Sequence, residues 1–372
     1  MELNGFFNGY SSNTLGGSGN QCFFLSDGGV KTGRIYYKVQ CGGEYEYSLL
    51  FTNVIDSTYS DGSVSVKNLA CGQYEIFSVK AAACESDWFS GLDIADAEAV
   101  NGRKPEFTRV LFDGCESKTV ASGEAFKSDG FTLDVAQDGY ICVEIDFAGE
   151  MMPYHEESLL PIYVQDEGRW VYSKRTVLPC CVACRREVKK RVAFWGDSIT
   201  QGIGCRANGY RHWNALLAKR LGDAYSYWNI GLGYGRAQDA ASDGIWMKKA
   251  LCCDIVFVCF GVNDILQSIP PETVKDYLLH TVRTLKEQKK TVILQTLPPF
   301  DYSGRLIEDW HGINRYIKEV LCGYADLVFD NTLILGLPEE RHKAAFSGHP
   351  NEEGCALWAD ALYVALKENG IF

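Results

Sequence analysis

Two residues of the types that carry out nucleophilic hydrolysis stand at positions where their side chains can meet. Ser198 lies in Gly196-Asp197-Ser198, directly after an apolar run. A serine on a tight turn between a strand and a helix can present its hydroxyl at the edge of a sheet, as a nucleophile must. His349 lies in a Gly-His-Pro-Asn segment before the last predicted helix, where an imidazole can act as general base. The structural alternatives are a helix cap for Ser198 and an ordinary loop position for His349.

Two further segments offer hydrogen-bond donors to a developing negative charge. Gly233, Tyr234 and Gly235 end a glycine-rich turn after the second predicted strand, where close backbone approach leaves N–H groups accessible. Asn263 follows the third predicted strand, and its side-chain amide can donate in the same way, although an Asx turn would also explain it. The glycine-rich turn matches neither a P-loop nor a dinucleotide fingerprint, so no cofactor is expected.

The elements that must position these residues lie in the second half of the chain, residues 189–372. Apolar runs typical of strands covered on both faces alternate there with amphipathic segments typical of helices. The strand-like runs are 191–195, 226–230, 254–260, 291–297 and 326–330. This alternation predicts a doubly wound parallel α/β sheet with helices on both faces. Functional residues of such sheets gather at the carboxyl ends of the strands, where Ser198, the glycine-rich turn and Asn263 stand.

Two helices of this half have recognisable ends. Residues 271–288 follow a helical apolar period, and Pro271 suits the first position of that helix. The last helix is expected to begin after Asn351, a good N-cap residue, and to end near Gly370.

Residues 1–185 have a different pattern, with short runs rich in Tyr, Val, Ile and Phe between clusters of turn residues. This pattern predicts an antiparallel all-β sandwich. The strand-like runs are 34–39, 45–55, 73–79, 109–112, 139–147 and 169–173. The basic run 185–191 is expected to link the two domains, which are predicted to span residues 1–185 and 189–372.

The four segments, in the order Ser, Gly, Asn and His, resemble the blocks of the SGNH/GDSL hydrolase family of serine esterases over residues 189–372. The resemblance implies a flavodoxin-like three-layer α/β/α domain with Ser198 as nucleophile and His349 as base. It also implies an oxyanion hole formed by the N–H of Ser198, an amide of Gly233, Tyr234 or Gly235, and the side chain of Asn263. No metal or cofactor is required by this chemistry.

Two positions depart from the family pattern. The family has glycine five residues after the asparagine that corresponds to Asn229, and Tyr234 stands there in this chain. The family also has aspartate three residues before the histidine, and Phe346 stands there. A phenylalanine side chain cannot orient an imidazole, so the acid of the Ser-His-Asp triad is missing from its usual place.

Three explanations of the missing acid remain open. A Ser-His dyad can operate with a backbone carbonyl as the partner of the histidine. Alternatively, an acid from elsewhere in the chain can replace the aspartate, and the candidates are Asp197, Asp330, Glu340 and Glu352. The third explanation is an impaired enzyme.

The N-terminal half suggests a class of substrate. Two-domain members with a jelly-roll-like N-terminal sandwich resemble bacterial carbohydrate acetylesterases, which implies short acyl, above all acetyl, esters of oligosaccharides. Trp88, Trp170 and the tyrosines of 36–47 are candidates for stacking on sugars, and residues 56–61 for contacting substrate. The alternatives are a lysophospholipase or thioesterase, and a carbohydrate-binding protein with a catalytically impaired hydrolase domain.

Composition narrows the partners. The formal charge of −12 argues against nucleic acid and anionic membranes, which require basic patches. The start shows no signal-peptide pattern and no run is long enough to cross a bilayer, so a cytoplasmic location with reduced thiols is expected for the 15 cysteines. The CysCysxxCys segment at 180–184 lacks the second ligand pair of a zinc site. The oligomeric state is not indicated.

Overall fold

The computed structural model describes residues 3–59, 65–340 and 343–372. The chain divides into two compact units, Met1–Val188 and Lys189–Phe372.

The second unit is built on one parallel sheet. Its strands are β17 (Lys190–Gly196), β18 (Tyr225–Asn229), β19 (Ile255–Cys259), β20 (Thr291–Gln295) and β21 (Leu327–Phe329). Their order across the sheet is β18-β17-β19-β20-β21, the flavodoxin-like order 2-1-3-4-5. The prediction of a parallel sheet is confirmed. The strand order reverses direction between β17 and β19, and loops at such a switch point diverge and leave room for a ligand.

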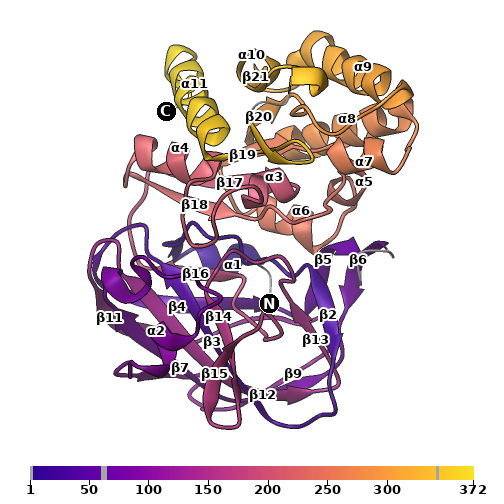
Figure 1. The fold of residues 1–372 in the computed structure, drawn as a ribbon. Helices are drawn as coiled ribbons and strands as arrows, with labels where there is room; N and C mark the ends of the chain where they lie inside the picture. The colour runs from indigo at the N-terminus through magenta and orange to yellow at the C-terminus, as the bar shows by residue number, and fades with distance from the viewer. Residues whose placement is uncertain (1–2, 60–64, 341–342) are drawn as a thin grey trace. The chain divides into compact units, whose positions relative to one another are not determined.

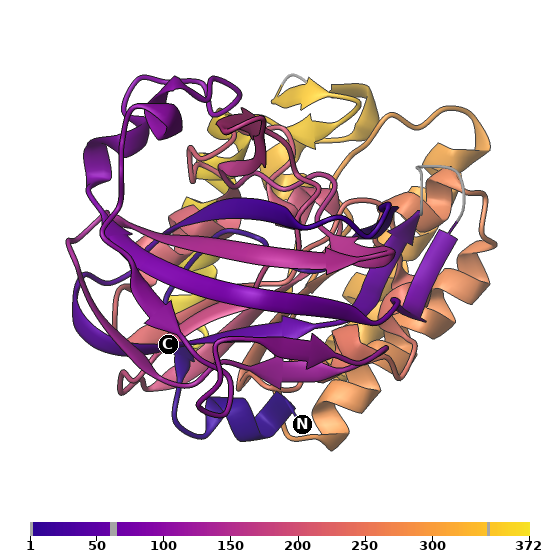
Figure 2. The same ribbon diagram turned by 90° about the horizontal axis from the view of Figure 1, so that it is seen from below.

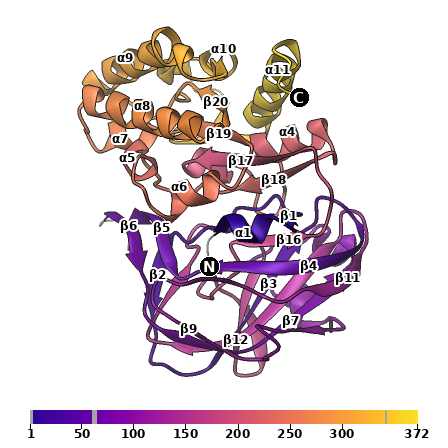
Figure 3. The ribbon, with the colours of Figure 1, turned by 180° about the vertical axis from the view of Figure 1, so that it is seen from behind.

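Helices lie on both sides of this sheet. Figures 1 and 3 show α4 (Trp213–Leu221) and α11 (Glu352–Glu368) on one side and α8 (Pro271–Glu287) and α9 (Arg305–Glu319) on the other. The shorter helices of this unit are α3 (Ser198–Gln201), α5 (Ala237–Ala240), α6 (Ile245–Ala250), α7 (Val262–Leu266), α10 (Thr332–Leu335), η2 (Leu321–Gly323) and η3 (Pro338–Glu340). Because both faces are covered, β18 to β20 are buried almost throughout, which explains their continuous apolar sequence.

The helix ends follow the sequence signals closely. Pro271 is the first residue of α8, as predicted. Asn351 caps α11, as predicted, and its side chain accepts a hydrogen bond from Gly354 N at 2.8 Å. The helix ends at Glu368, shortly before Gly370. The core of the unit contains five fully buried tryptophans, which are Trp195, Trp213, Trp246, Trp310 and Trp358.

The first unit consists mainly of antiparallel strands, which run alongside one another in Figure 2. A five-stranded sheet holds β1 (Ser11–Ser12), β16 (Cys181–Cys184), β4 (Gly43–Thr52), β10 (Ala125–Lys127) and β11 (Phe131–Val135). A seven-stranded sheet holds β15 (Arg169–Tyr172), β14 (Ile162–Asp166), β3 (Lys31–Lys38), β12 (Tyr140–Gly149), β7 (Tyr74–Cys84), β8 (Thr108–Val110) and β9 (Lys118–Val120). The remaining elements are the pairs β2 (Cys22–Leu25) with β13 (Met151–Tyr154) and β5 (Val54–Tyr59) with β6 (Ser65–Ala70), and the helices α1 (Leu3–Phe7), η1 (Ser86–Phe89) and α2 (Glu98–Asn101).

One apolar core serves both large sheets of this unit. Leu49 and Phe51 of β4 belong to the same buried cluster as Ile35 of β3 and Val143 and Ile145 of β12. The prediction of a β-rich unit with antiparallel strands is confirmed. The jelly-roll order of its strands stays a prediction.

Three expectations for this part of the chain need correction. The basic run 185–191 is only partly a linker, because Lys190 and Arg191 already belong to β17. Trp88, Trp170 and the tyrosines at 36, 37 and 47 are buried, so these rings are not presented to a sugar, whereas Tyr45 is half-buried against the core. Within 56–61, Asp56 is buried and accepts a hydrogen bond from Asn20 N, and residues 60 and 61 lie outside the described residues.

All 15 cysteines are free thiols, and most of them are buried. In the described part of the chain, no three His, Cys, Asp or Glu side chains are grouped so that they could hold a metal ion. Within the same ranges, every helix is too short or too polar to cross a bilayer.

Candidate active site

The position of Ser198 is fixed by the end of β17 and the start of α3. A Cβ atom on Gly196 would lie 2.1 Å from Thr200 Oγ1 and 2.7 Å from Cys259 O, so only glycine fits where the chain turns. Asp197 is the N-cap of α3, and its Oδ1 accepts a hydrogen bond from Ile199 N at 3.0 Å. The alternative in which Ser198 serves as the helix cap is therefore wrong, and its hydroxyl is left for another partner.

His349 is carried by a small hairpin formed by β22 (Ala344–Phe346) and β23 (His349–Pro350). The two loop residues, Ser347 and Gly348, both have positive φ angles, of 46° and 90°. Such a pair is typical of a tight type I′ connection, in which the residues before and after the loop face each other. Phe346 is therefore paired with His349 across the hairpin.

The structure brings Ser198 and His349 together. Ser198 Oγ lies 2.9 Å from His349 Nε2, and both side chains are only 9% exposed. On the other side of the ring, His349 Nδ1 lies 3.3 Å from the backbone oxygen of Phe346. A carbonyl oxygen can only accept, so the imidazole proton belongs on Nδ1 and Nε2 is left to accept the proton of Ser198. This is the tautomer that a general base for serine requires.

The imidazole is enclosed by aromatic rings. The ring of Phe300 meets it edge-on with a centroid distance of 5.0 Å, and the ring of Phe346 lies at 4.6 Å on a tilted plane. Burial lowers the pKa of His349 to about 4, while the hydrogen bond to the Phe346 carbonyl acts in the opposite direction. The histidine is therefore neutral, and able to accept a proton, at every pH well above 4.

The candidate acids are engaged elsewhere. Asp330 accepts hydrogen bonds from two threonine hydroxyls and pairs with Lys318 Nζ at 2.9 Å, and these bonds hold the pKa of its carboxyl below the usual range although burial raises it. Glu352 accepts a hydrogen bond from a backbone N–H at 3.3 Å. The side chain of Glu340 lies outside the described residues. Among the described acids none is hydrogen-bonded to His349, which has Ser198 Oγ and the Phe346 carbonyl as its partners.

The fourth candidate acid, Asp197, directly precedes the nucleophile and is buried. Oδ1 caps α3, and Oδ2 has no hydrogen-bond partner within the described residues. Burial raises the pKa of Asp197 to about 7, and nearby Asp264 raises it further, against the effect of the Ile199 N–H. Burial also raises the pKa of Asp264 to about 6, although this carboxylate accepts a hydrogen bond from Ala237 N at 2.8 Å.

Two amides of the glycine-rich turn donate to acceptors within the protein. Gly233 N donates to Gln201 Oε1 at 2.6 Å, and Gly235 N donates to Leu232 O at 3.1 Å. Tyr234, between them, has a φ of 61°, in the left-handed region that favours glycine. This conformation explains why the family pattern has glycine at this position, and the tyrosine adopts it at a cost of about 1–2 kcal/mol. The tyrosine is 37% exposed.

Asn263 reaches the same turn from α7. Its Nδ2 donates one hydrogen bond to Gly235 O at 2.9 Å, so the side chain is oriented by the turn. The amide nitrogen carries a second hydrogen, which is available to another acceptor. Asn263 is buried and contacts the glycine-rich turn, the other segment that the sequence predicts to donate hydrogen bonds to an oxyanion.

Two residues that matter for this geometry were not singled out from the sequence. Phe300 follows β20 in an unremarkable apolar run, and nothing in the sequence shows that it packs on the histidine. Gln201 directly follows Gly-Asp-Ser-Ile-Thr. Its place one helical turn after the nucleophile was the sequence signal that could have identified it.

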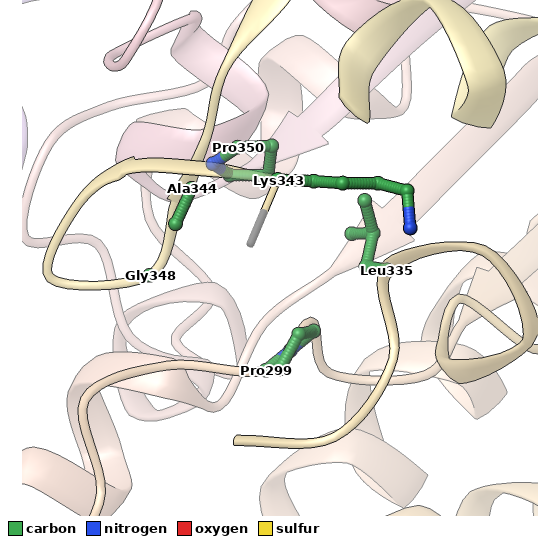
Figure 4. A pocket seen from close by; sticks show the side chains of 6 residues that line it. All are labelled: Pro299, Leu335, Lys343, Ala344, Gly348 and Pro350. Atoms are coloured by element: carbon green, nitrogen blue, oxygen red, sulfur yellow. The ribbon is translucent and has the colours of Figure 1, made fainter. Parts of the chain in front are cut away.

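A pocket lies against the hairpin that carries the histidine (Figure 4). It is lined by Lys343, Ala344, Gly348 and Pro350 of the hairpin segment and by Pro299 and Leu335 opposite, with an empty volume of about 210 Å³. Gly348 and Pro350 are the direct neighbours of His349 in the chain.

The second unit matches the model of a known protein family. Residues 194–357 match the model of the GDSL-like Lipase/Acylhydrolase family. No curated protein matches the chain.

Several solved structures are similar to the chain. A member of the lipolytic protein G-D-S-L family from Veillonella parvula is 24% identical, covers 48% of this chain and 96% of its own, and gives a TM-score of 0.41. An acetylxylan esterase from Geobacillus stearothermophilus is 19% identical, covers 50% and 95%, and gives 0.39. A third structure, an acetyl xylan esterase, is 21% identical, covers 47% and 99%, and gives 0.38.

Proposed function

Residues 194–357 belong to the GDSL-like lipase/acylhydrolase family, a family of carboxylic ester hydrolases, and we propose that this chain uses Ser198 as the nucleophile of a serine esterase. The observation that carries the proposal is the alignment of three groups, in which the Phe346 carbonyl holds Nδ1 of His349 and Nε2 faces Ser198 Oγ at 2.9 Å. This is a Ser-His dyad, and a backbone carbonyl replaces the acid of a triad.

In the acylation step, Ser198 Oγ attacks the ester carbonyl while His349 Nε2 takes the hydroxyl proton. The carbonyl oxygen becomes an oxyanion, and the imidazolium that forms is stabilised by the Phe346 carbonyl, a weaker partner than a carboxylate. The intermediate then collapses, the C–O bond to the alcohol breaks, and His349 returns its proton to the leaving oxygen. An acyl-enzyme on Ser198 remains.

Three donors are proposed for the oxyanion hole. They are the N–H of Ser198, the second N–H of the Asn263 side chain, and the amide of Tyr234. Tyr234 is proposed as the donor of the turn because it stands five residues after Asn229, where the family pattern has its glycine. A backbone N–H can serve here whatever side chain its residue carries.

Deacylation uses the same groups in reverse. His349 Nε2 accepts a proton from water, the hydroxide oxygen attacks the acyl carbonyl, and the proton passes to Ser198 Oγ as the ester bond breaks. The carboxylic acid is released and the free serine is restored. No metal or cofactor takes part in these steps.

For the substrate we propose a short acyl ester, above all an acetyl ester, on an oligosaccharide. The support is the resemblance of the two-domain organisation to carbohydrate acetylesterases, which is an analogy at the level of fold. The buried tryptophans and tyrosines of the first unit give no support to sugar stacking there.

The test of esterase activity compares Ser198→Ala with the wild type on 4-nitrophenyl acetate. Ser226→Ala is the matched control, because Ser226 is a buried serine of β18 in the same unit. We expect Ser198→Ala to lose at least about 1,000-fold in kcat/KM and Ser226→Ala to keep the wild-type rate. Equal rates for Ser198→Ala and the wild type would refute the esterase and leave a binding protein with a silent hydrolase domain.

The acyl group is tested with 4-nitrophenyl esters of increasing chain length and with a chemically acetylated oligosaccharide. We expect kcat/KM to be highest for acetyl and to fall with each added pair of carbons, and acetate to be released from the oligosaccharide. A maximum at long acyl chains would instead identify a lysophospholipase or thioesterase.

A further inference from the structure

We propose that Gln201 is a positioning residue of the oxyanion hole, which it sets by holding the glycine-rich turn at a fixed place relative to the nucleophile. This inference rests on the esterase function proposed above. Gln201 touches no reacting atom, and it acts through the backbone of the turn.

The contact between Gln201 and the turn is direct. Oε1 of Gln201 accepts a hydrogen bond of 2.6 Å from Gly233 N, the amide immediately before Tyr234. The side chain is only 1% exposed, so water does not compete for this bond. The hydrogen bond therefore fixes the peptide next to the one whose N–H we assign to the oxyanion.

Gln201 and the nucleophile are the two ends of a single helix. The helix α3 runs from Ser198 to Gln201, and Gln201 N donates to Asp197 O at 2.9 Å, which closes its one turn. A side chain at position 201 is consequently fixed relative to the Ser198 N–H. The two backbone donors proposed for the oxyanion, at positions 198 and 234, are connected through this helix and one hydrogen bond.

The start of the turn is held on the same helix. The Asn229 side chain donates to the carbonyls of Thr200 and Gln201 at 3.3 Å each and accepts from Gly231 N at 3.0 Å. A Cβ on Gly231 would lie 2.5 Å from Gln201 N, so the turn packs directly on the backbone of α3. At its far end the turn is held by Asn263 Nδ2 on Gly235 O. Gln201 supplies the middle attachment.

The physical consequence concerns the transition state more than substrate binding. An oxyanion hole works because its donors are placed before charge develops, and a donor displaced by a fraction of an ångström loses most of its effect. Without the Gln201 acceptor, Gly233 N–H is buried and unsatisfied, and the turn must move to find another partner. Such a movement lowers kcat and leaves the binding of the neutral ester, and hence KM, nearly unchanged.

The experiment replaces Gln201 by methionine, which has a similar length but no comparable acceptor. Gln295→Met is the matched control, because Gln295 of β20 is equally buried in the same unit and also accepts one hydrogen bond, from Trp358 Nε1 at 2.8 Å. Each substitution removes a buried hydrogen bond accepted by a glutamine Oε1, and the donor is Gly233 N of the turn for Gln201 and Trp358 Nε1 for Gln295. Steady-state kinetics on 4-nitrophenyl acetate and thermal unfolding are measured for both variants.

We expect Gln201→Met to lower kcat about tenfold or more with KM within about twofold of the wild type. Gln295→Met should unfold at a lower temperature and keep the wild-type kcat. A wild-type kcat in Gln201→Met would overturn the inference, and so would an equal loss of kcat in the two variants, since that would reflect general destabilisation.

Gln201→Asn covers the case in which the methionine variant does not fold. Asparagine keeps a polar amide but is one methylene shorter, so its oxygen cannot reach Gly233 N without movement of the turn. A loss of kcat at constant KM in this variant supports the inference, and a wild-type kcat contradicts it.

The result is separable from the proposed function. If the wild type hydrolyses the ester and Ser198→Ala does not, the esterase holds whatever the Gln201 variants do, and an unchanged kcat in them refutes only the positioning role. If the wild type and Ser198→Ala are equally slow, the esterase itself is refuted.

Discussion

The two members of the catalytic pair are held in different ways. Ser198 begins a helix that is capped by Asp197 and surrounded by a buried polar network, in which the Asn214 and Asn229 side chains bond the carbonyl of Thr200. His349 stands on a two-stranded hairpin with one backbone carbonyl at 3.3 Å and two aromatic rings as its support. The pocket of Figure 4 lies against that hairpin.

This difference shows two solutions to the problem of orienting a reactive side chain. On the serine side, side-chain hydrogen bonds fix the backbone, so single polar side chains matter. On the histidine side, the conformation of the turn places the carbonyl that orients the ring, so the backbone matters and the side chain at 346 does not take part in the hydrogen bond. On the serine side, removal of a polar side chain should therefore have the larger effect on activity. On the histidine side, a change in the backbone of the turn should have the larger effect.

The largest effect is expected when either member of the pair is removed. His349→Ala should lower kcat/KM by about 1,000-fold or more, as Ser198→Ala does, and the double variant should be no slower than either, because the two act as one unit. His280→Ala, an exposed histidine of α8, is the control and should keep full activity. A double variant much slower than both single variants would mean that the two side chains act independently.

The next effect concerns the turn of the hairpin. Gly348 has a φ of 90°, and a Cβ there would lie 2.5 Å from Phe300 Cα, so Gly348→Ala must displace the hairpin. We expect a loss of about tenfold or more in kcat/KM and a destabilisation of about 1–3 kcal/mol in denaturant unfolding.

Gly312→Ala in α9 serves as the control for this turn. It introduces the same methyl group into open space in a helix, and it should stabilise the protein by about 0.5–1 kcal/mol without change of activity. If Gly348→Ala keeps the wild-type rate, the turn does not set the position of His349.

A smaller effect on rate, but a clear one on pH dependence, is expected for the side chain at 346. Burial lowers the pKa of His349 to about 4, so wild-type kcat/KM should be constant from pH 8 downwards and fall only as the pH approaches 4, where the base becomes protonated. Phe346→Ala removes a ring that covers the imidazole but keeps the carbonyl. Its kcat/KM at pH 8 should stay within about threefold of the wild type, while the acid limb moves towards the ordinary histidine value of about 6.5.

A pH–rate profile of the two proteins checks this expectation. An unchanged acid limb in Phe346→Ala would show that another group governs the profile. A large loss of rate at pH 8 would show that the ring itself, and not the carbonyl, positions the base.

The smallest effect is expected on the serine side, in stability. Burial raises the pKa of Asp197 to about 7, above its value in the unfolded chain, so the folded state binds a proton that the unfolded state has released. The protonated Asp197 carboxyl therefore stabilises the folded state by its whole amount below about pH 4, and this stabilisation declines as the pH rises to about 7. Asn keeps the cap of α3 without this charge, so the stability of Asp197→Asn relative to the wild type should rise between pH 4 and pH 7 and then level off.

Denaturant unfolding at several pH values measures this difference. Asp254→Asn is the control, because this carboxylate also accepts a backbone hydrogen bond, from Arg191 N at 2.8 Å, but at the start of β19, away from Ser198. A relative stability of Asp197→Asn that falls with rising pH would contradict a buried, protonated Asp197.

The sequence predicted the parts of this molecule that depend on local pattern. Continuous apolar runs gave the five parallel strands, and Pro271 and Asn351 marked helix starts, because these signals reflect burial and capping over a few residues. The order of the four blocks, through its resemblance to the SGNH/GDSL family, also predicted the meeting of Ser198 with His349.

What the sequence did not predict depends on contacts between distant residues. The sequence left the partner of His349 open between a backbone carbonyl and a substitute acid, because any residue at 346 supplies a carbonyl and no residue type could decide between them. The commitment of the Gly233 and Gly235 amides follows from hydrogen bonds that residue types do not specify. The tryptophans and tyrosines of the first unit are ambiguous in the same way, because an aromatic ring suits a core and a sugar-binding surface equally well.

The dyad of Ser198 and His349 is tested most directly by trapping the nucleophile. The protein is incubated with diethyl 4-nitrophenyl phosphate, which phosphorylates an activated serine, and the modified residue is located by peptide mass spectrometry in the wild type and in His349→Ala. We expect one diethylphosphoryl group per chain, on Ser198, and a labelling rate at least about 100-fold lower in His349→Ala. A label on another residue, or equally fast labelling of Ser198 without His349, would contradict the dyad.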